Sequence, residues 1–315
     1  MAASRFDPRA TDIWRVGIVA ADAATILRRG GVGTLPVTWL AERGRFTYDA
    51  DPFGLWRDEI LHLFVEAFDY RTRHGTIDVL RFDATLRPID RRTCLYEPWH
   101  LSYPVVFEAD GTTWLLPEAF KSGTLTLYRC VDFPRRWEPA ARIDLDAPAV
   151  DATPFRHEGR WWLAYAPGTD KGARQGRLHL AFADRLTGPW RVHPDNPIRI
   201  DQGGARPGGS VVQRDGMPVL PVQDCSESYG GGLRPLRFTR LTVDSAETEL
   251  EPPLDPPASA GRYRAGFHTL SDCGPVALID VKRVDLGAGG RAIDARRILR
   301  GLLPRTMRTR GGGGV

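Results

Sequence analysis

A segment of about fifty residues recurs along the chain, and this repeat limits the possible folds more than any other feature. Prolines 52, 104, 154 and 207 each begin a similar stretch, so successive copies start 52, 50 and 53 residues apart. Each stretch alternates apolar and polar residues on both sides of a polar turn, which is the pattern of half-buried strands in a hairpin. A fifth, more divergent copy fits residues 266–280. A period of this length with strands in every copy is typical of a β-propeller.

The sequence therefore predicts an all-β fold, a five-bladed β-propeller over residues 13–290. An N-terminal strand often completes the last blade of a closed propeller, and residues 14–19 have a strand-like composition. We expect this strand to close the ring. Residues 1–12 are expected to be disordered. Residues 291–315 are expected to form a basic tail with a short helix and a glycine-rich end.

Composition excludes several classes of protein. The chain has 315 residues, 42% apolar and 26% charged, an ordinary globular mixture. Its four cysteines lack metal-binding spacing, which favours free thiols in a reducing, cytoplasmic compartment. We expect no cofactor, and no metal because the sequence shows no dedicated ligand loop. The sequence shows no signal-peptide core and no apolar run of about 18 residues, so no membrane span is expected. The arginines are scattered rather than clustered, which argues against nucleic-acid binding.

Polar residues recur at two positions of the repeat where strands facing the ring centre would otherwise be apolar. The first set is Asp51, Ser102 or Tyr103, Asp151, Arg206 and His268. The second set is Glu66, Glu118, Tyr165, Gln223 and Asp280. Buried charges are costly unless they are paired or used. The two sets therefore predict either a functional site at one mouth of the channel or a ring of structural ion pairs.

Two segments, Asp51-Pro-Phe-Gly-Leu and Asp151-Ala-Thr-Pro-Phe, resemble the Asp-Pro-Ser-x-Phe segments of five-bladed propeller glycosidases, the arabinanase, xylosidase and invertase-like superfamily. The resemblance covers about residues 45–285. It implies that Asp51 is the general base or nucleophile and that Asp151 orients the acid and tunes its pKa. The blade-four acid of that superfamily lies in a Glu-x-Pro segment, and here this segment reads Ala205-Arg206-Pro207.

A second set of motifs resembles the N-terminal domain of the glucosamine inositolphosphorylceramide transferases, which also occurs in bacterial proteins. The motifs are His100-Leu-Ser-Tyr-Pro-Val-Val-Phe, Leu116-Pro-Glu-Ala, Ala205-Arg-Pro-Gly-Gly, Gln223-Asp-Cys-Ser-x-x-Tyr-Gly-Gly, His268-Thr-Leu and Ile279-Asp-Val-Lys-Arg. In the plant enzymes a separate domain carries the glycosyltransferase fold. The resemblance implies sugar biology and the propeller fold without supplying a transferase site.

Glycoside cleavage needs two carboxyl groups. We expect Asp51, Asp151 and Glu118 to be catalytic, with Glu118 (or Glu66) as a relocated acid. Alternatively, a sugar phosphate or nucleotide sugar needs no acid, and Arg206 could hold its phosphate. The substrate-binding candidates are Glu66, Tyr103, Arg206, Gln223, Asp224, Tyr229, His268 and Lys282. The alternative to an enzyme that acts on sugars is a non-catalytic sugar-binding or scaffold propeller that partners a glycosyltransferase.

Overall fold

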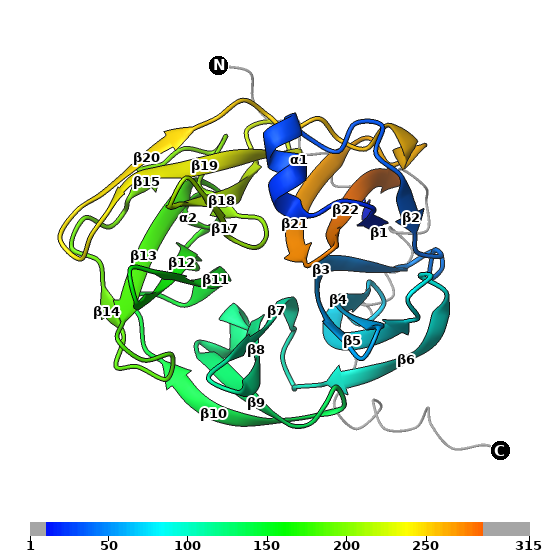
Figure 1. Ribbon diagram of the computed structural model, residues 1–315, viewed down its shortest axis with the longest axis horizontal. Helices are drawn as coiled ribbons and strands as arrows, with labels where there is room; N and C mark the ends of the chain where they lie inside the picture. Colours follow the sequence, from blue (N-terminus) through cyan, green and yellow to red (C-terminus); the bar gives the residue numbers. More distant parts are fainter. Residues whose placement is uncertain (1–10, 286–315) are drawn as a thin grey trace, which may run out of the picture.

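The computed structural model describes residues 11–285, whose strands form five antiparallel sheets around a central axis (Figure 1). This arrangement confirms the five-bladed propeller predicted from the repeat. Most of the segment expected to be disordered at the N-terminus, and the whole of the expected basic tail, lie outside the described residues.

Each blade is one sheet. The strands of each blade are given below from the ring centre outwards, so the innermost strand comes first. Blade I contains β3 (Thr47–Arg57), β4 (Ile60–Asp69), β5 (His74–Phe82) and β6 (Pro88–Leu95). Blade II contains β7 (Ser102–Ala109), β8 (Thr112–Glu118), β9 (Leu125–Asp132) and β10 (Arg136–Ile143). Blade III contains β11 (Ala149–His157), β12 (Arg160–Pro167), β13 (Arg177–Ala183) and β14 (Arg191–Val192), and β15 (Arg199–Ile200) also pairs with β13.

The last two blades follow the same plan. Blade IV contains β16 (Arg206–Pro207), β18 (Met217–Asp224), β19 (Gly232–Leu241) and β20 (Ala246–Leu250), with β17 (Val212–Arg214) also paired to β18. Blade V contains β21 (Gly266–Cys273), β22 (Val276–Asp285), β1 (Thr11–Val19) and β2 (Val37–Trp39). Short helical segments connect some strands: α1 (Ala23–Arg29), α2 (Lys171–Gly176), η1 (Phe120–Ser122) and η2 (Ala258–Ala260).

The ring is closed by pairing between the two ends of the described chain. Strand β1 runs antiparallel to β22, with Thr11 opposite Asp285 and Val19 opposite Ala277. The N-terminal strand therefore lies inside the last blade, as the sequence predicted. On its other side, β1 pairs with β2 through Gly17, Ile18 and Val19, so β1 is an inner strand of the blade at this end.

Helix α1 interrupts the connection between β1 and β2. The Asp22 side chain accepts a hydrogen bond from the Thr25 backbone N–H at 2.6 Å, which caps the first turn. Gly30 ends the helix with a φ of 76°, a conformation suited to glycine. Ile26 and Leu27 are buried in a cluster shared with blades IV and V. The helix thus covers the ends of these blades.

The hydrophobic core lies between neighbouring blades rather than at the ring centre. Phe155 of blade III and Phe238 of blade IV, for example, are both buried and their ring centroids are 6.1 Å apart. Burying a side chain of this size contributes roughly 1.5–3 kcal/mol. The space around the axis is left to the polar residues of the innermost strands, and this positions the candidate site.

Candidate active site at one end of the channel

Three residues at the same position of the repeat share an uncommon backbone conformation. Asp51, Tyr103 and Asp151 have φ angles of 50°, 44° and 50°. This left-handed region is seldom occupied by residues other than glycine. Each residue lies in a register shift of the innermost strand of its blade. These shifts span residues 50–53, 102–105 and 150–153. A bulge breaks the regular alternation and redirects a side chain, so in these three blades the bulge redirects the side chain of Asp51, Tyr103 or Asp151.

A cavity of about 260 Å³ lies beside these bulges, and we call it the central cavity. It is formed by residues of blades I, II and IV and the segments that connect them. The lining residues are Tyr48, Asp51, Glu66, Phe68, His100, Ser102, Glu118, Phe120, Lys121, Arg206 and Tyr229. Carboxyl groups, two cationic groups and aromatic rings therefore share one small space.

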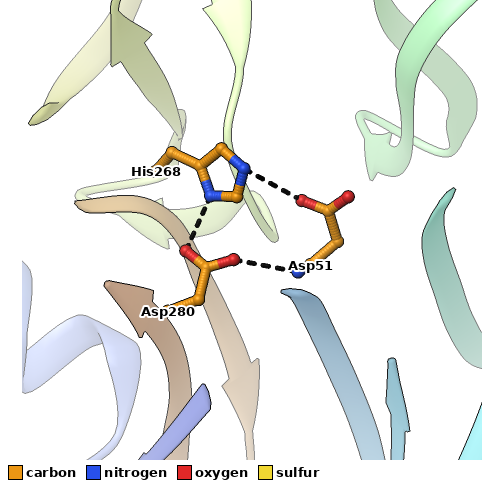
Figure 2. Close-up of side chains that lie close together, drawn as sticks. All are labelled: Asp51, His268 and Asp280. Atoms are coloured by element: carbon orange, nitrogen blue, oxygen red, sulfur yellow. Dashed lines mark hydrogen bonds and ion pairs between the residues drawn. The ribbon is translucent and has the colours of Figure 1, made fainter. Parts of the chain in front are cut away.

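Asp51 belongs to a hydrogen-bonded group with His268 and Asp280 (Figure 2). His268 Nε2 lies 3.5 Å from Asp51 Oδ1, and His268 Nδ1 lies 2.7 Å from Asp280 Oδ1. The second oxygen of Asp280 accepts a hydrogen bond from the Asp51 backbone N–H at 2.9 Å. Asp280 therefore holds both the imidazole ring and the backbone that presents the Asp51 carboxyl group.

The protonation of this group follows from its burial. Burial raises the pKa of Asp51 to about 7, with the charge of His268 opposing the rise and the charges of Asp151 and Asp280 adding to it. Burial alone would lower the pKa of His268, but the charge and hydrogen bond of Asp280 raise it above its ordinary value. The raised pKa favours the charged form of His268, which lies between the carboxyl groups of Asp51 and Asp280. Asp51 can gain or lose a proton near neutral pH.

Asp151 occupies the equivalent position in blade III but has different partners. Arg206 Nε donates to Asp151 Oδ2 at 2.7 Å, and Gln223 Nε2 donates to the same oxygen at 2.8 Å. Both donors come from blade IV. The Arg206 guanidinium also lies 4.9 Å from the ring centroid of Tyr229. A buried charge pair of this kind is a fixed unit, since removing one partner leaves the other charge unpaired.

Glu66 and Glu118 are buried, with exposed fractions of 6% and 5%. Burial raises the pKa of both well above the usual range, and nearby carboxyl charges add to the effect: Asp51 for Glu66 and Asp151 for Glu118. The raised pKa values favour the protonated form of both glutamates. A protonated carboxyl group can donate a hydrogen bond or a proton to a ligand.

His100 is a basic side chain beside Glu66: its Nε2 lies 3.6 Å from Glu66 Oε1. Its Nδ1 accepts a hydrogen bond from the Gly75 backbone N–H at 2.9 Å, so the ring proton is on Nε2. Burial, together with the charges of Lys121 and His74, lowers the pKa of His100 to about 4. A neutral His100 cannot compensate a charge on Glu66, which is consistent with a protonated glutamate.

The structure brings six of the residues singled out from sequence to the central cavity: Asp51, Glu66, Ser102, Glu118, Arg206 and Tyr229. Three more lie directly behind them. Asp151 accepts hydrogen bonds from Arg206 and from Gln223, and His268 contacts Asp51.

Three other predicted residues lie away from the central cavity. The Tyr103 hydroxyl accepts a hydrogen bond from the Gly209 N–H at 2.6 Å and lies 2.9 Å from Thr153 Oγ1. Lys282 is 1% exposed, and its Nζ donates to the Tyr229 carbonyl oxygen. Asp224 accepts a hydrogen bond from the Ser226 N–H at 3.0 Å and lines a different pocket.

Sequence reasoning missed several residues of the cavity wall, namely Tyr48, Phe68, His100, Phe120 and Lys121. A signal for some of them was present. Phe68 follows Glu66 at the two-residue spacing that places side chains on one face of a strand. Tyr48 is the cross-strand partner of Phe68. Phe120 and Lys121 lie in η1 directly after the strand that carries Glu118.

One group of side chains within residues 11–285 has the composition of a metal site. Ligand atoms of Asp51, His268 and Asp280 all lie within 4.8 Å of one another. However, His268 Nδ1 is bonded to Asp280, and Asp280 also accepts the backbone N–H groups of Asp51 and Thr269. Hydrogen bonding within the protein already satisfies these atoms, so the residues fit a charge network better than a metal.

No helix among the residues that the structure describes is long and apolar enough to cross a membrane.

Solved structures with the same fold include glycoside hydrolases. A family 117 glycoside hydrolase from Zobellia galactanivorans has a TM-score of 0.53 at 12% identity, covering 88% of this chain and 92% of that one. A GH43_1 enzyme from Xanthomonas citri has a TM-score of 0.51 at 14% identity, covering 83% and 92%. At such low identity the similarity establishes the propeller fold alone.

Sequence comparison gives a closer relationship. Glucosamine inositolphosphorylceramide transferase 1 from Arabidopsis thaliana is 36% identical over 258 residues, which cover 80% of this chain and 32% of that protein. The protein of the same name from Oryza sativa subsp. indica is 32% identical over 257 residues, which cover 77% and 34%. The chain thus spans about a third of the length of these relatives. A family model described as glucosamine inositolphosphorylceramide transferase 1, N-terminal, matches residues 40–263, and the chain belongs to this family.

Proposed function

We propose that this propeller is a carbohydrate-active enzyme of polysaccharide or glycolipid metabolism that acts on a glycosidic or sugar–phosphate bond in the central cavity. The observation that carries the proposal is the presence of three buried carboxyl groups with raised pKa values in one small cavity. Such groups are costly to bury, and they cluster at sites that move protons.

The protonation states support a division of roles. Glycoside cleavage requires one carboxyl group that protonates the leaving oxygen and one carboxylate that acts on water or on the anomeric carbon. Glu118, whose pKa lies well above the usual range, is the proton donor. Asp51, whose pKa is about 7, is partly ionised at neutral pH and is the base or nucleophile. Asp151 fixes Arg206 beside them through its 2.7 Å ion pair.

The other walls of the central cavity suit a sugar ring. Phe68 and Phe120 offer apolar surface to the C–H face of a ring, while Ser102 and Tyr229 offer hydroxyl groups. Arg206 and Lys121 can attract a phosphate on the same sugar, because both line this cavity. The name of the plant relatives, glucosamine inositolphosphorylceramide transferase 1, supports glycolipid metabolism as the setting.

A second candidate function is a non-catalytic sugar-binding or scaffold propeller that works beside a glycosyltransferase. One observation favours it: Arg206 lies where the related glycosidases are expected to carry their acid, and its charge is paired with Asp151 rather than available as a proton donor.

Product detection by mass spectrometry tests the proposal. The purified chain is incubated with a panel of glycans and aryl glycosides, with and without nucleotide sugars. We expect product from the wild type and a loss of about 10²–10⁴-fold in turnover for Asp51→Asn and for Glu118→Gln. Asp244→Asn, a change at an exposed carboxylate, is the matched control and should retain full turnover.

The outcomes separate the two functions. Product without a nucleotide sugar indicates hydrolysis, whereas product only in its presence indicates transfer. Equal turnover in the wild type and both site variants would reject the assigned roles. Sugar binding without product from any substrate would favour the accessory function.

A further inference from the structure

A second pocket lies beside the central cavity, between blades IV and V. Its volume is about 870 Å³, and we call it the lateral pocket. Its walls are the loop at residues 224–232, the proline-rich segment 253–260 and residues 263–267 at the start of β21. Pockets for small molecules commonly measure about 300–1,000 Å³. The central cavity, at about 260 Å³, falls below this range, so it suits a single ring, whereas the lateral pocket can hold a larger group.

One loop separates the two spaces. Tyr229 lines the central cavity, while Ser228 and Gly231 of the same loop line the lateral pocket. The Gly231 N–H donates to the Asp224 carbonyl oxygen at 3.0 Å, which makes the loop a tight turn. The Lys282 ammonium group donates to the Tyr229 carbonyl oxygen. The loop is therefore a fixed ridge between the two spaces.

Gly230 fixes the position of this ridge. Its φ is 60°, and a Cβ atom here would come within 2.8 Å of His268 and of Trp14. Its carbonyl oxygen accepts a hydrogen bond from the Phe267 N–H at 3.1 Å. Gly230 thus packs against His268, and His268 contacts Asp51, which lines the central cavity. The positions of the two spaces relative to each other are therefore fixed.

The walls of the lateral pocket differ in chemistry. One wall is apolar and comes from Pro253, Leu254, Pro256 and Pro257. The loop opposite is polar and carries Asp224, Ser226, Glu227 and Ser228. A sugar unit has an apolar C–H face and a rim of hydroxyl groups, so its faces match these two walls. Hydroxyl groups donate well to carboxylates.

The two spaces differ in the charge of the ligand that each favours. The lateral pocket has two acidic residues, Asp224 and Glu227, and one basic residue, Arg264. An anionic group therefore gains little there, whereas Arg206 and Lys121 attract it to the central cavity. The unit in the lateral pocket is accordingly expected to be uncharged.

We propose that the lateral pocket is a second carbohydrate subsite, which binds uncharged sugar units of a substrate whose reacting unit lies in the central cavity. The inference rests on the proposed function, because it extends the same site. It specifies a substrate of at least two units that crosses the ridge at Tyr229.

Calorimetric titration of the full chain tests the subsite. The probes are neutral oligosaccharides of one to four units built from glucose, galactose, xylose or arabinose. We expect affinity for at least one series to rise about tenfold or more from one unit to the longer members. Ala258→Trp places a large ring in the lateral pocket from an exposed wall position and should abolish this gain while leaving single-unit binding unchanged.

Two further variants keep the test decisive. Ala84→Trp introduces the same ring at an exposed alanine in the turn between β5 and β6 and should behave as the wild type. Glu227→Gln, at an exposed position, should reduce only the gain with length. Single-unit binding without any gain with length, or a gain that survives Ala258→Trp, would overturn the subsite alone. A failure of every sugar to bind, together with no product by mass spectrometry, would overturn the proposed function and the subsite with it.

Discussion

Asp51 and Asp151 occupy the same position of the repeat, with the same φ of 50° and the same type of bulge, yet their surroundings differ. Asp51 faces His268, which it shares with Asp280. Asp151 faces Arg206 and Gln223. The backbone of the repeat presents each aspartate in the same way, and the neighbouring blade decides its chemistry. One aspartate is free to exchange a proton, and the other holds a cation in place.

The largest effect should come from breaking the ion pair of Asp151. Arg206→Met keeps much of the side-chain volume but leaves the Asp151 carboxylate buried without its cation. We expect a loss of about 3–5 kcal/mol in the free energy of unfolding, measured by urea denaturation at pH 7. The matched control is Arg142→Met, because Arg142 and its partner Asp144 are 65% and 86% exposed. Similar losses in the two variants would mean that burial of the Asp151 pair has no special weight.

A smaller effect should distinguish Asp51 by its response to pH. Its pKa in the folded protein is about 7, above the ordinary value of 3.8, so the folded state binds this proton more tightly than the unfolded state. Stability from this group is therefore present at low pH and is lost as pH rises towards 7. The loss between pH 5 and pH 8 is roughly 2–3 kcal/mol.

Asp51→Asn removes this titration, so its free energy of unfolding should fall less between pH 5 and pH 8 than that of the wild type. Asp244→Asn, at an exposed site, should retain the wild-type dependence. If Asp51→Asn and the wild type lose equal stability over this range, the raised pKa of Asp51 is wrong.

The smallest effect concerns Tyr103, the third residue of the series. Tyr103→Phe removes the acceptor of the Gly209 N–H and should cost about 1–3 kcal/mol in the free energy of unfolding. Turnover of the folded fraction should not change, because the hydroxyl lies outside the central cavity. Tyr96→Phe, at a residue 67% exposed, is the control. A selective loss of turnover in Tyr103→Phe would return this residue to the substrate-binding set.

The fold could be predicted because its signal is local and repeated. Alternation and turns recur about every fifty residues, and each copy folds into the same hairpin. Helix α1 was missed because its seven residues form one short amphipathic segment inside a linker, stabilised largely by burial of Ile26 and Leu27 against other blades.

The sequence could predict which residues lie near one another in the site, and it could not predict their partners. The repeat indicated that Asp51, Glu66 and Glu118 lie near one another, and all three line the central cavity. It could not indicate that Arg206 pairs with Asp151, because that contact depends on the placement of blade IV beside blade III. Asp224 shows the same limit: it directly follows Gln223, yet it faces the lateral pocket.

The pairing of β1 with β22 has a consequence for the order of folding. Thr11 meets Asp285 only when the two ends of the described chain come together, and contacts of such long range tend to form late. Strand β1 also carries Trp14, whose ring stacks on His268 with centroids 3.6 Å apart. We therefore expect ring closure to complete the burial of His268, the residue that contacts Asp51. The raised pKa of Asp51 is then expected only in a chain whose two ends have met.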